Sequence, residues 1–253
     1  MFLDEKILDR NIIKSVIKAF NLLEILVEYE KLGVSELSEI TKLGKSTTHR
    51  MLNTLKYLNY VEQDPESGDY FATIRLFELG NKVANKMPIK KIARPHLEEL
   101  FSKTNETINL GILDGQSVLY LDKIVSKEPL RIELDIGIDV PIYSSALGKT
   151  LAAFNEDINL ESIEFVKYTE NTIHSYEEFI KELEKIKKQG YAFDDEEYIK
   201  GLVCIAVPVL NLDNKAVASV SISLPAARLN EKNLDYYVKI LKKCTRNIEK
   251  HLL

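Results

Sequence analysis

Residues 35–59, SELSEITKLGKSTTHRMLNTLKYLN, contain two short segments with helical apolar spacing, separated by Lys42-Leu43-Gly44. Glycine suits the tight turn between two helices that cross at a steep angle. The second segment predicts a helix from about Lys45 to Tyr57. The stretch therefore predicts a helix-turn-helix. The alternative is a pair of helices whose polar face is merely solvated.

The predicted second helix has an apolar and a polar side. Its inner side carries Thr48, Met51, Leu52, Leu55 and Leu58. The first turn and the outer side supply the candidate DNA-contacting residues, which are Lys45, Ser46, Thr47, His49, Arg50 and Asn53. Arginine and asparagine can each make two hydrogen bonds to a purine, and hydroxyls near a helix N-terminus can hold phosphates. No acid occurs between Thr41 and Tyr60, although the formal net charge of the chain is -5, so nucleic-acid contact must come from this local patch.

The composition indicates a globular protein of one large or two smaller domains, with 253 residues of which 45% are hydrophobic. Cys204 and Cys244 are the only cysteines, too few for a disulfide framework, so a cytoplasmic location is expected. The charged N-terminus MFLDEKILDRNIIK lacks the apolar centre of a signal peptide. No apolar run reaches the ~18 residues of a membrane span, so no membrane association is expected.

The flanks of the helix pair extend the pattern. A helix is expected from about Ile13 to Glu28, with the stripe Val16, Phe20, Leu23 and Val27 facing inward. After Asn59, two β-favouring pairs flank the turn 64-DPESGD-69, which predicts a hairpin and hence a winged helix. The acids of this wing would repel phosphates, so its expected contribution is limited to backbone contacts at Ser67-Gly68.

The remaining residues predict a linker and an α+β domain. We expect a winged helix-turn-helix domain at 1–73, a linker helix at 74–88 and an antiparallel-sheet domain at 89–253. Strands are expected at 108–113, 118–125, 203–210 and 216–224, with a further short one at Arg131–Leu134, and helices at 144–154, 176–189 and 230–253.

Two of these strands define a polar patch. In 218-ASVSIS-223, serines alternate with Val220 and Ile222, so one strand face carries the hydroxyls. If Asp213-Asn214 is a two-residue hairpin turn, Cys204 lies on the same face as Ser221 and Ser223. Small hydrogen-bonding groups would then converge as in a pocket for a small polar ligand.

Several long motifs, in order along nearly the whole chain, resemble the IclR family of bacterial transcriptional regulators. They are KSVIKAFNLLEIL (14–26), LSEITKLGKSTTHRMLNTLKYLNYVEQD (37–64), LFELG (76–80), ARPHLEEL (93–100), ETINLGILDGQSVLYLDKI (106–124), SSALGKTLAA (144–153), GYAFDDEEYIKGLVCIAVPV (190–209) and SVSISLPAARL (219–229). The resemblance implies a C-terminal effector-binding domain related to the GAF fold. It also implies a homodimer or homotetramer on a palindromic DNA operator, usually as a repressor, under the control of a small carboxylate such as a 2-oxo acid or a sugar acid. Thr73, where glycine is frequent, and the acidic wing depart from the family pattern.

The same resemblance implies effector-binding positions where the motifs align, which are Ala146, Leu147, Asp194, Leu202, Cys204, Ser221 and Ser223. Free backbone N–H groups at the start of the helix in SSALGK would receive the carboxylate. Asp194 would accept a hydrogen bond from a ligand hydroxyl or a water. Each position also has a plainer interpretation. Cys204 can be a small buried hydrophobe, the serines can face solvent, and 194-DDEE-197 can be a solvated loop.

Two other classes of function are open to this sequence. An enzyme would need a nucleophile, but Ser145 and Lys149 are four residues apart rather than three, and no histidine lies near Cys204 in sequence. No HExxH motif or paired-cysteine zinc spacing occurs, so neither metal nor cofactor is expected. A winged helix that binds only protein is the second alternative, and the cationic patch argues against it.

Overall fold

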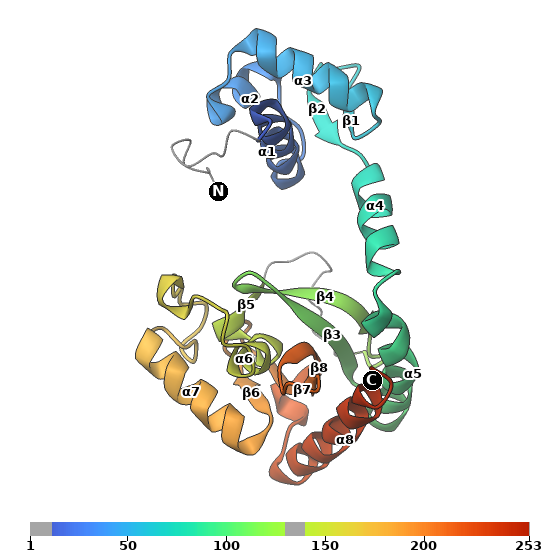
Figure 1. Cartoon of the computed structure of the whole chain (residues 1–253), viewed down its shortest axis with the longest axis vertical. Coiled ribbons are helices and arrows are strands. Elements are labelled where there is room, and N and C mark those ends of the chain that lie inside the picture. Colours follow the sequence, from blue (N-terminus) through green and yellow to red (C-terminus); the bar gives the residue numbers. More distant parts are fainter. Residues whose placement is uncertain (1–11, 130–139, 253) are drawn as a thin grey trace. The chain divides into compact units, whose positions relative to one another are not determined.

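The computed structural model describes residues 12–129 and 140–252. The first residues of the charged N-terminus and the strand expected at Arg131–Leu134 lie outside them. The chain divides into two compact units, residues 1–83 and 84–253, and the boundary falls within the segment expected to be a linker (Figure 1).

The N-terminal unit is a winged helix-turn-helix, as predicted. Its elements are α1 (Lys14–Glu28), α2 (Val34–Thr41), α3 (Lys45–Tyr57), β1 (Val61–Gln63), β2 (Tyr70–Ala72) and α4 (Arg75–Ala84). Lys42 ends α2 in the left-handed region at φ 55°, and Gly44 is the N-cap of α3. Leu37 and Leu52, from the two helices of the motif, are fully buried with Val61 of the wing, so one core holds α3 against its supports.

The side of α1 that faces this core differs from the predicted stripe. Of the predicted stripe only Leu23 is buried, whereas Val16, Phe20 and Val27 are 49%, 61% and 61% exposed. Leu22 and Leu26 join Leu23 in the core, so the helical period was correct but the buried face is rotated toward the neighbouring stripe. An apolar side of α1 is therefore left uncovered within one chain.

The C-terminal unit is α+β, as predicted. Its elements are α5 (Pro88–Thr104), β3 (Thr107–Asp114), β4 (Ser117–Ile124), β5 (Val140–Pro141), α6 (Ala146–Ala153), α7 (Tyr176–Gln189), β6 (Ala192–Asp195), β7 (Leu202–Leu210), β8 (Ala216–Pro225) and α8 (Glu231–Glu249). The described strands form one antiparallel sheet in the order β5-β4-β3-β8-β7-β6. One apolar core lies between this sheet and helices α5 and α8, and a second lies between the sheet and helices α6 and α7 (Figure 1).

The β7–β8 hairpin reaches the predicted register by a different turn. Cys204 pairs with Ser223, which is the parity predicted from a two-residue turn. The turn itself is longer, because the loop closes with a hydrogen bond of 3.0 Å from Asn211 N to Lys215 O. A β-bulge that leaves Val217 unpaired restores the register. The serine face of β8 therefore lies where the sequence placed it.

Two glycines allow close packing around α6. A Cβ atom on Gly148 would lie 2.4 Å from the Cα atom of Ile142, in the 3-10 turn Ile142–Ser144 that precedes α6. A Cβ atom on Gly111 of β3 would lie 2.7 Å from Val118 Cγ1 and 3.1 Å from Leu147 Cδ1. Gly148 therefore lets α6 pack against that turn, and Gly111 lets Leu147 of α6 lie against β3.

Gly148→Ala is therefore expected to destabilise the C-terminal unit by ~1–3 kcal/mol. The added methyl group would overlap backbone atoms of Ile142, which a change of side-chain rotamer cannot relieve. Urea unfolding followed by circular dichroism measures the change. Gly80→Ala is the matched control, since a Cβ atom there meets nothing within 4 Å and lies in helix α4. A midpoint for Gly148→Ala equal to that of the wild type would contradict the close approach.

Candidate functional site

The polar side of α3 is exposed and its apolar side is anchored. Thr48 and Leu52 are fully buried, and Met51 is partly buried. Leu58, predicted to lie inward, is 49% exposed, because α3 ends at Tyr57 and the chain turns away. All candidate contact residues are exposed, namely Lys45, Ser46, Thr47, His49, Arg50 and Asn53.

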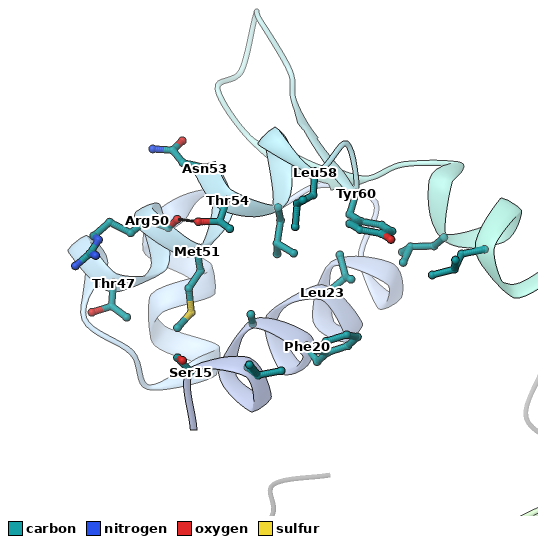
Figure 2. Close-up of a pocket in the computed structure, with 15 residues that line it drawn as sticks. Ser15, Phe20, Leu23, Thr47, Arg50, Met51, Asn53, Thr54, Leu58 and Tyr60 are labelled. Carbon is teal, nitrogen blue, oxygen red and sulfur yellow. Dashed lines mark hydrogen bonds between the residues drawn. The ribbon is translucent and has the colours of Figure 1, made fainter. Parts of the chain in front are cut away.

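Arg50 and Asn53 project from α3 on the side away from α1 (Figure 2). Arg50 forms no salt bridge within residues 12–129 and 140–252, so its guanidinium is available to a partner. The ring of His49 lies 3.4 Å from the Asn53 amide nitrogen, one turn apart. The guanidinium of Arg50 and the amide of Asn53 thus lie on one exposed face of α3. Both groups can make two hydrogen bonds to a purine in the major groove.

An apolar groove of about 710 Å³ runs beside this face, between α1 and α3 and along the start of α4 (Figure 2). Thr47, Arg50 and Asn53 belong to its lining from α3. The apolar lining comes from the uncovered side of α1 and from α3 and α4, and includes Val16, Ala19, Phe20, Leu23, Met51, Leu55, Leu58, Leu76 and Leu79. The groove lies wholly within the N-terminal unit.

One acid of the wing has a structural role. Asp64 forms an ion pair with Lys31 and accepts from the backbone N–H of Glu66 at 2.8 Å. The hydrogen bond from Lys31, followed by those from the turn, lowers the pKa of Asp64 to about 2. Asp64 therefore fixes the wing turn, and its charge is balanced by Lys31.

The candidate effector residues are brought together in the C-terminal unit. All of them except Ser223 line one small cavity, with Tyr120, Val140, Ser145 and Tyr198 as its other lining residues. The cavity measures about 10 Å³, which is room for about one water molecule. A metabolite needs this cavity to open.

Asn109 of β3, which the sequence analysis did not single out, joins the two serines. Its amide nitrogen donates to Ser221 Oγ at 3.2 Å and to Ser223 Oγ at 3.0 Å. Asn109 pairs with Ser221 across the β3–β8 ladder, so the serines are buried rather than facing solvent. The alternation of polar and apolar residues in 107-TINL-110 was the available signal, since it puts Asn109 opposite the core-facing Ile108 and Leu110.

The N-terminus of α6 closes another side of the cavity. Ser145 is the N-cap, and its Oγ accepts from Gly148 N at 3.1 Å. In an α-helix the first backbone N–H groups have no partner within the helix, and here they belong to Ala146 and Leu147. Both residues are buried at the cavity, so the positive end of the helix dipole lies where an anion would be held.

Asp194 is a buried strand residue, not part of a solvated acidic loop. It lies on β6, pairs with Cys204 and is 3% exposed. Its Oδ1 accepts from Glu197 N at 2.8 Å. Burial first, and then the charge of Glu197, raise the pKa of Asp194 to about 7, and the charge of Lys149 opposes them.

The cysteine of the cavity is a poor nucleophile in this setting. Burial, and then the charge of Asp194, raise the pKa of the Cys204 thiol well above its usual value. Ser145 is occupied as a helix cap. A neutral thiol and a capping hydroxyl do not make an activated nucleophile.

A winged helix-turn-helix with an exposed polar helix face, linked to a second domain with a buried polar cavity, defines the class of two-domain DNA-binding regulators. Residues 81–250 match the family model described as "Bacterial transcriptional regulator IclR C-terminal", and residues 15–65 match that of the "IclR helix-turn-helix domain". The chain belongs to the IclR family of bacterial transcriptional regulators.

Similar proteins include the "HTH-type transcriptional regulator KdgR" of Dickeya chrysanthemi, 41% identical over 240 residues, which are 93% of this chain and 79% of that protein. The structure of the Thermotoga maritima IclR protein is 31% identical, covers 94% of this chain and 98% of its own, and superposes with a TM-score of 0.72. An IclR homolog from Microbacterium hydrocarbonoxydans, complexed with 4-hydroxybenzoate, is 22% identical, covers 93% and 98% of the two chains, and has a TM-score of 0.76. Within the part of the chain that the structure describes, no helix could cross a membrane.

Proposed function

We propose that this protein is a cytoplasmic repressor that binds a palindromic DNA operator as a homodimer or a homotetramer, and is released from it by a small carboxylate metabolite. The observation that supports control by a metabolite is one cavity lined by the α6 N-terminus, Asp194 and Ser221, with Asn109 donating to Ser221 and Ser223. The relatives are named as regulators, and we propose binding of the metabolite without turnover.

In the DNA complex, α3 enters the major groove. Arg50 and Asn53 contact base edges, His49 contributes from the same face, and Lys45, Ser46 and Thr47 hold phosphates at the start of the helix. The wing contributes backbone contacts at Ser67-Gly68. Two copies of α3 would lie at half-sites about one helical turn, ~34 Å, apart.

A second copy of this chain is the occupant proposed for the part of the groove formed by α1 and α4, which leaves Thr47, Arg50 and Asn53 of α3 to the DNA. Helix α4 buries no residue within one chain, and Phe77, Leu79 and Val83 on it are 62%, 48% and 62% exposed. This surface continues the uncovered side of α1 at the groove. Contiguous apolar area of this kind marks an interface, and identical faces pair in a two-fold dimer, whose symmetry matches a palindromic operator.

In the effector site, the carboxylate lies on the N–H groups of Ala146 and Leu147, with Leu202 as an apolar wall. Ser221 lines the cavity and accepts from Asn109, and its O–H would donate to a ligand oxygen. Ser223 accepts from the same amide and supports Ser221 and Asn109 from outside the cavity lining. The Microbacterium homolog is complexed with 4-hydroxybenzoate, which is a carboxylate. A ligand of this kind shifts the equilibrium between the DNA-binding and the released state of the protein. The size of the shift is set by the difference in ligand affinity between these two states, commonly ~1–3 kcal/mol.

Replacing both serines, Ser221→Ala with Ser223→Ala, is expected to weaken effector binding by about 10- to 100-fold, because the Ser221 donor to the ligand is lost and the buried Asn109 amide loses both of its serine acceptors. A thermal-shift screen of 2-oxo acids and sugar acids on the full chain identifies stabilising ligands, and titration of the variant measures the loss. DNA affinity without ligand should be unchanged. Ser102→Ala, an exposed serine on α5, is the control. An unaltered ligand response in the double variant would remove this site.

A further inference from the structure

Asp194 lies in a buried group of charges in which carboxylates outnumber cations. Glu197 is buried beside it, and Glu197 Oε2 has no hydrogen-bond partner among the residues that the structure describes. Lys149 Nζ donates to Glu197 Oε1 and to Phe193 O, both at 2.5 Å. Lys149 also lies 3.8 Å from Glu182 Oε1. One ammonium group is therefore shared among several acceptors.

The titratable groups around Asp194 come from every element packed against it. They are Cys204 on β7, Tyr120 on β4, Glu197 and Tyr198 in the segment after β6, Lys149 on α6 and, through Lys149, Glu182 on α7. Among the described residues of this group, Lys149 is the buried cation, beside Asp194 and Glu197. Glu182 is also paired with the exposed Lys185, at 3.2 Å. Burial, followed by the nearby Cys204 and Asp194, raises the pKa of Tyr120, so this phenol stays protonated.

An anionic ligand in this cavity would add a further negative charge to a region that water cannot screen. Like charges at close range in a poorly hydrated site cannot both stay ionised at neutral pH, and the usual outcome is that one of them takes up a proton. Of the carboxyl groups here, Asp194 lines the cavity, whereas Glu197 is held by Lys149. Asp194 is therefore the group that the incoming anion would meet.

We propose that the effector anion binds together with one proton, which resides on Asp194, so that the neutral carboxyl group donates its O–H to the ligand. This inference rests on the proposed carboxylate site. It replaces the role expected from the sequence, in which Asp194 is an acceptor. It also predicts a ligand rich in acceptors at this end, such as an oxo or carboxylate oxygen.

Asp194 in the ligand-free protein can take up this proton. Burial, and then the charge of Glu197, raise the pKa of Asp194 to about 7, so this carboxyl group can take up a proton near neutral pH. A bound anion raises that pKa further, so binding draws a proton from solvent. Effector affinity should then fall about 30-fold between about pH 6 and about pH 8.5.

Isothermal titration calorimetry on the full chain tests the coupling, with pyruvate and 4-hydroxybenzoate as probes. Both are monoanions around neutral pH, so their carboxylates do not titrate in this range. Titrations at one pH in buffers of different ionisation enthalpy give the number of protons taken up. We expect close to one proton at about pH 8. Binding without proton uptake would overturn the inference and leave the carboxylate site intact. Binding of neither probe at any pH would contradict both.

Two variants separate Asp194 from its neighbours. Asp194→Asn mimics the protonated carboxyl group, so it should bind the probes with less than about threefold change over the same pH range. Asp195→Asn alters an exposed neighbour and should keep the pH dependence of the wild type. A full pH dependence in Asp194→Asn would show that another group carries the proton.

Stability in the absence of ligand gives an independent readout. A carboxyl group whose pKa is higher in the folded than in the unfolded state contributes stability that is present at low pH and is lost as the pH rises through the folded-state value. For Asp194 the loss falls between the usual value of 3.8 and about 7. The urea midpoint of Asp194→Asn relative to the wild type should therefore rise from pH 5 to pH 8, about where this loss is completed. A constant difference would overturn the inference.

Discussion

Arg50→Ala is expected to weaken operator binding by ~1–3 kcal/mol, about 5- to 150-fold, and to relax base preference at one position of each half-site. Arg50 lies on the exposed face of α3 and forms no salt bridge within the described residues, so the substitution removes no internal ion pair. Its two donor edges match the O6 and N7 atoms of guanine. Fluorescence anisotropy on operators with single base changes measures both effects.

Arg75→Ala is the matched control for that experiment. It removes the same charge from the same unit, but Arg75 on α4 is engaged by Glu78 at 3.1 Å. This variant should keep its base preference and lose little affinity, since an exposed ion pair contributes at most about 1 kcal/mol. Equal affinity and unchanged specificity for Arg50→Ala and the wild type would refute the assignment of α3 as the recognition helix.

Phe20→Glu is expected to have the largest effect, by separating the proposed dimer. Phe20 lines the apolar groove and is 61% exposed in one chain, so the monomer should fold normally. A carboxylate there would have to lose its water against the partner's apolar surface, which is costly. Since both half-sites are then no longer bound together, operator affinity should fall by about 100-fold or more.

Analytical ultracentrifugation and gel-shift titration measure the two consequences of Phe20→Glu. Leu212→Glu is the control, because Leu212 is 80% exposed in the turn between β7 and β8 and has no part in the groove. Its sedimentation and operator affinity should match the wild type. A dimer that persists in Phe20→Glu, with unchanged operator affinity, would place the interface elsewhere.

The N-terminal fold could be predicted closely, because its signals are local. The turn at Gly44 and the apolar spacing that follows it fix α3 at Lys45–Tyr57, as in the structure. The inward stripe of α1 could not be fixed in this way. Val16 and Phe20 have the same helical period as Leu22 and Leu26, and only the packing of α2 and α3 decides which stripe is buried.

The candidate effector site was predictable at the level of strand faces. Alternation along β8 and the parity of the hairpin placed Cys204 with Ser221 and Ser223. The contribution of Asn109 was missed because it depends on β3 pairing with β8, between strands separated by more than one hundred residues. Local alternation indicates which face of β3 carries Asn109, but it does not indicate that β3 pairs with β8.

The contacts around Asp194 could not be predicted from the sequence, for the same reason. The run 194-DDEE-197 has the composition of an exposed loop. Lys149 reaches Glu197 from a different helix, and the backbone N–H of Glu197 reaches Asp194. These tertiary contacts, not local composition, turn an acidic run into a buried group of charges.

Selection by this chain from a pool of random DNA duplexes tests whether a pair of α3 helices recognises a symmetric operator. We expect enrichment of a two-fold symmetric sequence with half-site centres about one helical turn apart, and binding that falls steeply with salt concentration. Arg50→Ala should select the same symmetric sequence with preference lost at one symmetric pair of positions. No enrichment, or enrichment of an asymmetric sequence to which Arg50 makes no difference, would contradict recognition of a symmetric operator by α3.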